Sequence, residues 1–435
     1  MLLVGDPEIM RHIYVKDFDH FMDRRTFNMP SKKDRVMANM LSMKTGEEWK
    51  KLRAIMSPTF TSGKIKGMFP LVCKKADQLV SFCLKEARTK PFVDMKYNFG
   101  RFTLDTIASC AFVARETMRA RQSGNKRGDF LDLLLEAEVS TGDAEGISAV
   151  QDDNKSSTSK QTLNELTIIS QSVMFLLAGY DTTASTLAFV SILLAKHPEI
   201  QQRLRQEMSE MVEEHGDITY QGIMEAKYLD ACIMETLRLY PPGLFLERKC
   251  VKEYNLSQPT PRSPLARVRR PRRRIERRVE DGLSYKLTDE SVFICRECAE
   301  VVLNLRTQRQ INSENRIPGT DVTIEPGMVV TCPLFQIHRD PKYWPEPEVF
   351  RPERFLPENK ANITHLTHIP FGIGPRNCLA MRFALMEAKV ALAKMLLASD
   401  IRVAPGHEEI KTDFGMGLLR PKDGVNLLLT PLKEE

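Results

Sequence analysis

A loop rich in glycine and proline near the C-terminus constrains this chain more than any other stretch of its sequence. Residues 371–380 read Phe-Gly-Ile-Gly-Pro-Arg-Asn-Cys-Leu-Ala, and an apolar, helix-forming run follows from Leu379 to Leu397. Two glycines and a proline exclude a regular helix or strand, so the backbone must turn tightly there. The loop therefore presents one cysteine, Cys378, immediately before a predicted helix.

The position of Cys378 suggests a metal ligand. At a helix N-terminus, the helix dipole and the free backbone N–H groups favour the thiolate over the thiol. A thiolate is a strong axial ligand for haem iron. Arg376, two residues earlier, supplies a fixed cation that can meet a carboxylate such as a haem propionate. An isolated cysteine in such a turn is more often a buried, unreactive side chain, so the rest of the sequence has to decide.

The pattern Phe371-x-x-Gly374-x-Arg376-x-Cys378 resembles the haem-binding loop of the cytochrome P450 monooxygenases. One departure is Ala380, which stands where most members carry glycine. The resemblance implies that Cys378 is the proximal thiolate ligand of the haem iron. It also implies that Phe371 shields the sulfur and that Arg376 holds a propionate. Further motifs of the family occur upstream in the family's order.

The first of these motifs lies in a short helix predicted near residue 45. Thr45-Gly46-Glu47-Glu48 has the form of a capping box, which starts a helix. Trp49 and Arg53 are four residues apart and therefore share a helix face. Taken alone, the two residues fit an exposed cation–π pair. They also resemble the family's tryptophan-x-x-x-arginine helix, which implies that both bond a haem propionate.

A long apolar helix is predicted in the middle of the chain. The segment from Leu166 to Ala195 contains Asp181 as its only charged residue, and its length would suit a bilayer. Glycine, aspartate and threonine at its centre would be costly in lipid. We therefore predict a helix that begins near the capping box Thr162–Glu165 and is buried within a large protein.

The polar centre of this helix reads Ala178-Gly179-Tyr180-Asp181-Thr182-Thr183. A threonine hydroxyl can bond the carbonyl one turn back and open the helix. An acid and an alcohol side by side in apolar surroundings can relay protons. Helix-bending threonines beside a buried, hydrogen-bonded aspartate are the alternative. The sequence resembles the family's oxygen-activation motif, which implies that Asp181 and Thr182 deliver protons.

A third motif is the pair Glu235 and Arg238, three residues apart on a predicted helix that ends before Pro241-Pro242. Such a pair is usually a modest, solvated contact. Here the helix is otherwise apolar and resembles the family's Glu-x-x-Arg helix. The resemblance implies a buried structural network of Glu235, Arg238 and Arg354. Phe245 stands where some relatives have a propionate-binding arginine.

The cysteines and the charges exclude some classes of protein. The nine cysteines are scattered without a framework spacing, which argues against a disulfide scaffold and for a reducing compartment. Cys295-x-x-Cys298 is a single pair and a weak zinc site. The first residues form neither a signal peptide nor a membrane span. We therefore expect this chain to lack the N-terminal transmembrane anchor of its microsomal relatives.

Residues 257–316 interrupt the family pattern. They carry 13 Arg and 1 Lys against 8 acidic residues, a net charge of +6 that equals the charge of the whole chain. Such like-charge density cannot be buried and predicts a disordered insert. Its arginines are not interleaved with aromatic residues, so we expect no nucleic-acid partner.

A second break lies near 113–114, where the sequence skips the two helices that roof the substrate pocket in relatives. We predict an incomplete N-terminal and central part, 1–256, then the insert, 257–316, and a C-terminal haem-binding part, 317–435, of one P450 domain. A mis-joined coding segment is the simplest explanation for both breaks. Without the roof, we expect poor haem binding and weak, uncoupled turnover.

The resemblance implies a mainly α cytochrome P450 fold with a small β-region. It also implies a haem-thiolate monooxygenase that inserts one oxygen atom from O₂ into a small apolar substrate of xenobiotic, steroid or lipid type. The cofactor would be haem b, with electrons from NADPH passed on by NADPH-cytochrome P450 reductase. Full-length relatives imply the cytoplasmic side of the endoplasmic reticulum membrane. The alternatives are a non-catalytic haem-binding protein and the inactive product of a mis-joined gene.

Overall fold

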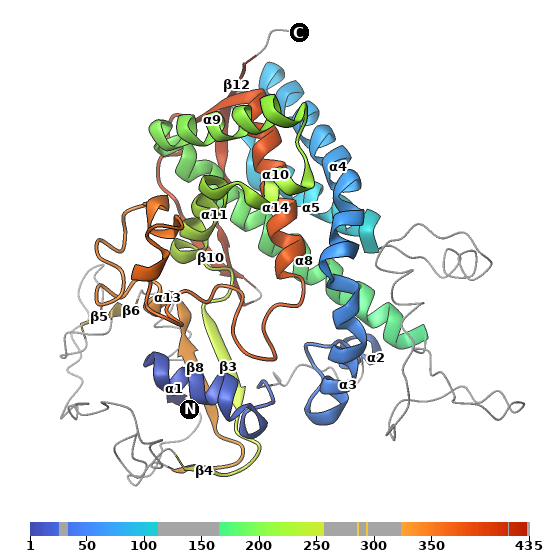
Figure 1. Ribbon diagram of the computed structural model, residues 1–435, viewed down its shortest axis with the longest axis vertical. Helices are drawn as coiled ribbons and strands as arrows, with labels where there is room; N and C mark the ends of the chain where they lie inside the picture. The colour runs from blue at the N-terminus through green and yellow to red at the C-terminus, as the bar shows by residue number, and fades with distance from the viewer. Residues whose placement is uncertain are drawn as a thin grey trace, which may run out of the picture. The chain divides into compact units, whose positions relative to one another are not determined.

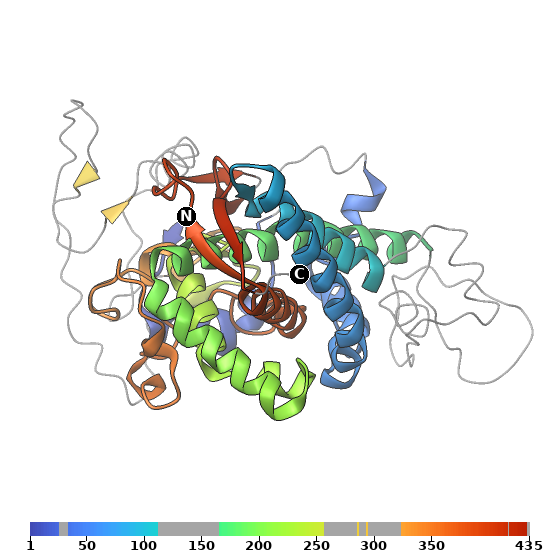
Figure 2. The ribbon, with the colours of Figure 1, turned by 90° about the horizontal axis from the view of Figure 1, so that it is seen from above.

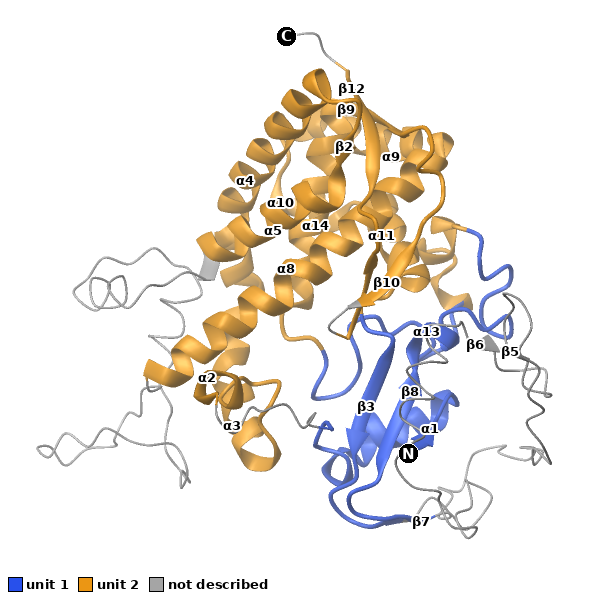
Figure 3. Cartoon of the chain, turned by 180° about the vertical axis from the view of Figure 1, so that it is seen from behind, with its two compact units in different colours: residues 1–25, 243–349, 363–377 blue, residues 26–242, 350–362, 378–435 orange. Residues whose placement is uncertain are grey.

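The computed structural model describes residues 1–25, 34–111, 165–255, 285–286, 293–294, 323–415 and 417–432. These residues form two compact units (Figure 3). Unit 1 comprises Met1–Arg25, Gly243–Val349 and Ile363–Asn377, and unit 2 comprises Thr26–Pro242, Phe350–Asn362 and Cys378–Glu435. The predicted seam at 113–114, the Cys295/Cys298 pair and nearly all of 257–316 lie outside the described residues.

Unit 1 is built on a three-stranded sheet with short helices beside it (Figure 1). In the sheet, β8 lies between β1, which is parallel to it, and β3, which is antiparallel. The elements are β1 (Leu2–Leu3), α1 (Pro7–Arg11), a π-helical turn (His12–Lys16), a 3-10 turn (Phe18–His20), β3 (Phe245–Lys249), β4 (Tyr254–Asn255), β5 (Tyr285–Lys286), β6 (Phe293–Ile294), β7 (Thr323–Ile324), β8 (Val329–Pro333) and α13 (Leu334–Ile337).

The local sequence accounts for the start of α1 and for the core above the sheet. The carboxylate of Asp6 caps α1 by accepting hydrogen bonds from the amides of Glu8 at 2.9 Å and Ile9 at 3.1 Å, and Pro7 occupies the first helical position, where its missing N–H costs nothing. Apolar side chains of the first helices then pack on β8. The core of unit 1 includes Ile13, Tyr14, Val330, Cys332 and Ile369.

Unit 2 contains the long helices. Its elements are α2 (Arg35–Ala38), α3 (Gly46–Met56), a 3-10 turn (Ser57–Phe60), α4 (Ser62–Thr89), β2 (Val93–Asp94), α5 (Met95–Ala111), α8 (Glu165–Lys196), α9 (Pro198–His215), α10 (Tyr220–Glu225), α11 (Lys227–Leu239), the 3-10 helices η5 (Pro352–Phe355) and η6 (Lys360–Asn362), α14 (Met381–Ala398), β9 (Ser399–Val403), β10 (Thr412–Gly415), β11 (Leu418–Pro421) and β12 (Asn426–Pro431). The strands form a sheet in the order β2-β12-β9 and a hairpin of β10 and β11.

Two helices organise the core of unit 2. The helix α8 packs against α5, α11 and α14, and α14 also contacts α4 and α9, as the view from above shows (Figure 2). The mainly α fold with a small β-region is confirmed.

The long central helix, α8, lies where the sequence predicted it. The prediction that it is buried holds for only part of its length. Residues 183–194 of α8 are buried without interruption, whereas Leu177 is 52% exposed and Tyr180 is 40% exposed. Among the described helices, α8 is the one long and apolar enough to cross a membrane, and 50% of its most apolar stretch is buried inside the protein. A core helix of a soluble protein has the same length and composition, so these two properties do not establish a membrane span.

Candidate functional site

The backbone of the loop 371–380 is set by two glycines. Gly372 has φ +73° and Gly374 has φ +70°, values that favour glycine over residues with a side chain. A Cβ atom at Gly374 would lie 1.8 Å from the carbonyl oxygen of Tyr14, so no larger residue fits there without moving the backbone. The amide of Asn377 donates to the carbonyl of Gly374 at 3.0 Å and closes the turn. The tight turn predicted from the sequence is therefore confirmed.

Cys378 follows this turn and differs from the other described cysteines. Its side chain is exposed, whereas Cys83, Cys232, Cys250 and Cys332 are buried and Cys73 is half-buried. Burial raises the pKa of Cys83 to about 12 and that of Cys73 to about 11. Those two thiols therefore stay protonated at neutral pH, and the exposed Cys378 is the more accessible sulfur for a metal.

The helix after Cys378 begins later than the sequence suggested. The prediction placed its start at Leu379, but α14 begins at Met381, with Ala380 in a non-helical conformation as the N-cap. Cys378 thus lies just outside the first helical turn. Because the dipole acts mainly within that turn, the stabilisation of a thiolate by the helix is weaker than we predicted.

Arg376 is 3% exposed, and its guanidinium lies 3.6 Å from the carboxylate of Asp23. A second guanidinium, that of Arg24, donates a hydrogen bond to the carbonyl oxygen of Arg376 at 3.0 Å. The sequence analysis did not identify Arg24 as a site residue. No local sequence pattern relates it to Arg376, which follows 352 residues later. The two arginines supply positive charge suited to binding a carboxylate. Phe371, in the same loop, is half-buried.

Trp49 and Arg53 lie on α3, as predicted, with Trp49 4% exposed and Arg53 half-buried. Thr45 is the N-cap of α3, but its side chain makes no capping hydrogen bond, and Glu48 pairs with Lys44 at 3.0 Å instead. The predicted helix start is therefore correct although the capping box is not formed.

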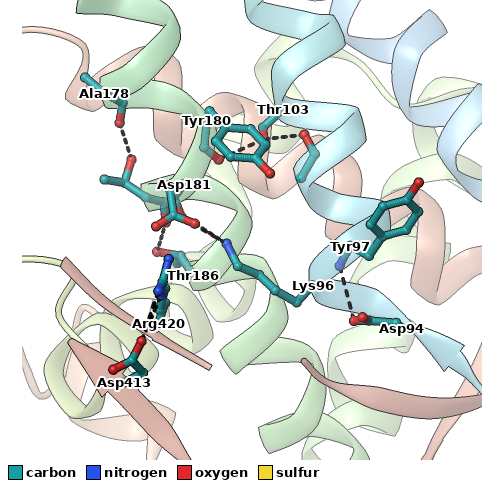
Figure 4. A network of polar contacts seen from close by, with 12 residues as sticks. Asp94, Lys96, Tyr97, Thr103, Ala178, Tyr180, Asp181, Thr186, Asp413 and Arg420 are labelled. Carbon is teal, nitrogen blue, oxygen red and sulfur yellow. Dashed lines mark hydrogen bonds and ion pairs between the residues drawn. The ribbon is translucent and has the colours of Figure 1, made fainter. Parts of the chain in front are cut away.

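The centre of α8 contains the predicted acid and alcohol (Figure 4). The hydroxyl of Thr182 donates to the carbonyl of Ala178 at 2.7 Å, one turn back, as expected. The helix nevertheless continues unbroken from Glu165 to Lys196, so the predicted opening does not occur. The carboxylate of Asp181 pairs with the ammonium of Lys96 on α5, a partner that the sequence did not indicate.

A further acid close to this turn was also missed. Glu387 on α14 is 1% exposed and forms a side-chain hydrogen bond with Thr183. Burial raises the pKa of Glu387 well above its usual range, and the bond from Thr183 opposes this only partly. An acid within the apolar run of Met381–Ala398 was a signal in the sequence, because ionisable residues are rarely fully buried without a role.

The predicted network of Glu235, Arg238 and Arg354 is brought together. Glu235 and Arg238 are both 0% exposed and form a bidentate pair, with Nε to Oε2 at 2.7 Å and Nη2 to Oε1 at 2.8 Å. Arg354 Nε lies 3.4 Å from Glu235 Oε1, and the amide of Arg351 donates to the same oxygen at 3.0 Å. One carboxylate thus joins α11 to η5.

The donor set suits a haem. Unit 1 contributes the guanidinium groups of Arg24 and Arg376, and unit 2 contributes the exposed thiol of Cys378 and the N–H group of Trp49. Thiolate sulfur is an established axial ligand of haem iron, and guanidinium groups bind carboxylates in a bidentate manner. The residues present therefore fit iron protoporphyrin IX.

Comparison with known proteins points to one family. The family model described as "Cytochrome P450" matches residues 1–124, 113–259 and 300–429. Cytochrome P450 3A41 of Mus musculus is 30% identical over 485 residues, covering 99% of this chain and 82% of the relative. Cytochrome P450 3A31 of Mesocricetus auratus is 33% identical over 445 residues, covering 91% and 75%. Cytochrome P450 9e2 of Blattella germanica is 31% identical over 480 residues, covering 93% and 78%.

These matches run through both units and include every motif discussed above. Between its matched ranges the family model leaves out residues 260–299, whereas it matches residues 300–316, which we predicted to belong to the insert 257–316. The chain therefore belongs to the cytochrome P450 family, of the eukaryotic microsomal type, whose members are haem-thiolate monooxygenases that use haem b and NADPH-derived electrons passed on by a reductase.

Proposed function

We propose that this chain is a monooxygenase that inserts one atom of O₂ into a small apolar organic substrate of xenobiotic, steroid or lipid type. The observation that carries the proposal is Cys378, an exposed thiol held after a turn in which Gly374 leaves no room for a side chain. When bound, haem b supplies the reduction and activation of O₂. The protein's part is to hold the cofactor, exclude water and deliver protons.

Each residue of the proposed site has a separate task. Cys378 Sγ would hold the haem iron, and Phe371, half-buried in the same loop, would shield the sulfur. Arg376, whose backbone carbonyl accepts a hydrogen bond from Arg24, would bind a propionate carboxylate. Trp49 and Arg53 would bind a propionate from α3. Glu235, Arg238 and Arg354 do not touch the reacting atoms and would stabilise the core around the cofactor.

Proton delivery is assigned to the centre of α8. The hydroxyl of Thr182 already donates to Ala178, so its lone pairs can accept a hydrogen bond from a protonated carboxyl. Asp181 is the adjacent acid that would donate it. Glu387, which burial keeps protonated, would hold a second proton beside Thr183. The proposed location, by likeness to the relatives, is the cytoplasmic side of the endoplasmic reticulum membrane.

The test of the proposal is Cys378→Ala, with Cys73→Ala as the matched control because Cys73 is half-buried and lies outside the proposed site. The wild-type protein and the control should show a thiolate-type Soret shift when they are reduced and exposed to CO. Cys378→Ala should lose this shift. A shift that persists in Cys378→Ala would overturn the ligand assignment.

A second measurement separates catalysis from simple haem binding. With NADPH, reductase and an apolar test substrate, the wild-type chain should form an oxygenated product that contains ¹⁸O from ¹⁸O₂. A normal CO spectrum without labelled product from a panel of apolar substrates would favour a non-catalytic haem-binding protein instead.

A further inference from the structure

The inference concerns Gln171, a polar residue near the N-terminal end of α8. Its side chain is 0% exposed, and its amide group bonds the backbone of a segment that lies 130 positions earlier in the chain. Oε1 accepts a hydrogen bond from the amide of Leu41 at 2.9 Å, and Nε2 donates to the carbonyl of Asn39 at 2.7 Å. One side chain therefore binds a donor and an acceptor of the same short segment.

The local structure of that segment accounts for the two bonds. Asn39 is the C-cap of α2, and the last carbonyls of a helix find no partner within the helix. In the turn that follows, the amide of Met43 donates to the carbonyl of Met40 at 2.9 Å. This bond uses neither the carbonyl of Asn39 nor the amide of Leu41. Because a buried backbone group without a partner is costly, Gln171 completes the hydrogen bonding of the turn.

The segment held by Gln171 leads directly into α3. Lys44 pairs with Glu48 in the first turn of α3 at 3.0 Å. Thr45 is the N-cap of α3, and its carbonyl accepts a hydrogen bond from the amide of Trp49 at 3.2 Å. The helix α2, on the other side of the segment, contacts α8 (Figure 3). The start of α3 is therefore attached to α8 through Gln171.

The far end of α3 is attached to the same helix. The 3-10 turn Ser57–Phe60 follows α3 directly. The ring of Phe60 packs edge-on against the ring of Phe175 on α8, with centroids 5.3 Å apart, and both rings are buried. Gln171 and Phe175 are four residues apart and share a face of α8. One polar and one apolar contact with this face thus hold the two ends of α3.

The same face of α8 continues to the turn that carries Thr182. Positions 171, 175, 178 and 182 follow the spacing of an α-helix and therefore lie on one side of it. At 1.5 Å per residue, Thr182 lies about 16 Å further along the axis than Gln171. Because α8 is continuous from Glu165 to Lys196, a contact that fixes α3 at Gln171 also fixes its distance from Thr182.

We propose that Gln171 is a positioning residue for the cofactor, acting through α3. By holding α3 on α8, it fixes where Trp49 and Arg53 can meet a propionate. The same contact sets the distance of this propionate site from Thr182. The amide of Gln171 acts indirectly, since its oxygen and its nitrogen are both bonded to the backbone. The inference rests on the proposed function in its assignment of Trp49 and Arg53 to propionate binding.

The test uses Gln171→Met, which keeps the length of the side chain but removes both hydrogen bonds. Gln201 on α9 offers a matched control, because it is 2% exposed and holds a backbone in the same way. Its Nε2 donates to the carbonyl of Ile401 at 2.8 Å, and its Oε1 accepts from the amide of the same residue at 3.0 Å. Ile401 belongs to β9, so Gln201→Met breaks an equivalent pair of bonds that does not involve α3.

The first measurement is residue-resolved hydrogen exchange of the ferric holoprotein. The amide of Leu41 should exchange about tenfold faster or more in Gln171→Met than in the wild type, because its buried acceptor is gone. Gln201→Met should accelerate the amide of Ile401 instead and leave Leu41 unchanged. An unchanged rate for Leu41 in Gln171→Met would overturn the inference, since Gln171 would then not hold the segment.

The second measurement is the propionate bending band in the resonance Raman spectrum of the ferric protein, which reports hydrogen bonds to the propionates. Gln171→Met should shift this band in the same direction as Trp49→Phe, which removes the indole N–H. The double variant should shift it by less than the sum of the two. Transfer of haem to apomyoglobin should also be several-fold faster in Gln171→Met. Gln201→Met should match the wild type in the band and in the transfer rate.

The outcomes separate this inference from the proposed function. If Trp49→Phe leaves the band in place, the assignment of Trp49 to a propionate fails. If Trp49→Phe shifts the band but Gln171→Met does not, only the role of Gln171 fails. Equal shifts in Gln171→Met and Gln201→Met would also overturn it, because the cause would then be a general loss of packing.

A second variant keeps the test decisive if Gln171→Met yields no holoprotein. Gln171→Asn retains a buried amide group that is one methylene shorter and cannot reach both Asn39 and Leu41. It should show the same faster exchange at Leu41 and a band shift in the same direction. Wild-type behaviour of Gln171→Asn in both measurements would overturn the inference.

Discussion

Glu387 illustrates how burial alone sets the protonation of a single residue. The carboxyl is 1% exposed, and its Oε1 has no hydrogen-bond partner among the described residues. Desolvation is the largest cause of its raised pKa. The folded protein therefore binds a proton there at pH values at which the unfolded chain has released it, since an exposed glutamate titrates near pH 4.3.

This difference predicts the sign of a pH effect on stability. The contribution of Glu387 is fully present below the unfolded pKa of about 4.3 and is lost as the pH rises through the folded pKa. Glu387→Gln cannot titrate, so its free energy of unfolding should fall less between pH 4 and neutral pH than that of the wild type. Urea unfolding at a series of pH values measures this.

Glu48→Gln is the control for Glu387→Gln, because the Glu48 side chain is 60% exposed in its pair with Lys44. Its curve of stability against pH should run parallel to that of the wild type. A Glu387→Gln curve that also runs parallel would mean that the buried carboxyl is ionised in the folded protein.

At the scale of secondary-structure elements, one carboxylate holds α11 to η5. Glu235 accepts two bonds from Arg238 on its own helix, one from the amide of Arg351, and lies 3.4 Å from Arg354. The ion pair of Glu235 with Arg238 lies within α11 and by itself connects this helix to no other element. The contacts with residues 351 and 354 are what turn a local pair into a connection between two elements.

Removing that carboxylate should be costly. In Glu235→Gln the guanidinium of Arg238 stays buried without its counter-charge, so we expect a loss of about 3–5 kcal/mol in the free energy of unfolding. Urea or thermal unfolding of the holoprotein measures the loss. The exposed-pair variant Glu48→Gln should lose no more than about 1 kcal/mol. Similar losses in the two variants would contradict a structural role for the network.

At the scale of the whole molecule, each unit is assembled from segments far apart in the sequence. The sheet of unit 1 pairs Leu2 with Val330 and Leu246 with Cys332. Strands β4 and β7 pair Asn255 with Thr323, so the chain leaves and returns between neighbouring residues. The segment 257–316, predicted to be an insert, lies between these two paired strands.

This pairing predicts the result of deleting residues 257–316. The two ends are already adjacent, and the entropy of closing a loop grows only with the logarithm of its length, so a shorter connection should change stability by about 1–3 kcal/mol at most. The CO spectrum should be retained. Trypsin should cleave the variant less, because the segment contains 13 of the chain's arginines. Loss of haem binding would show that the segment is part of the fold.

The sequence by itself determined the features that depend on neighbouring residues. The glycines of the loop 371–380, the helices α3 and α8, and the pair of Glu235 with Arg238 follow from backbone freedom and from helical spacing. The resemblance added roles for Cys378, Asp181 and Thr182, which stay proposals. The later start of α14 at Met381 shows that even a local boundary can shift by two residues.

Only the tertiary structure decided which distant residues meet. Lys96 and Asp181 are 85 positions apart, Arg351 and Glu235 are 116 apart, and Arg24 and Arg376 are 352 apart. No local pattern marks such pairs, because a contact across that distance depends on the path of the whole chain. The burial that keeps Glu387 protonated arises in the same way, since it requires the helices packed around α14 to be in place.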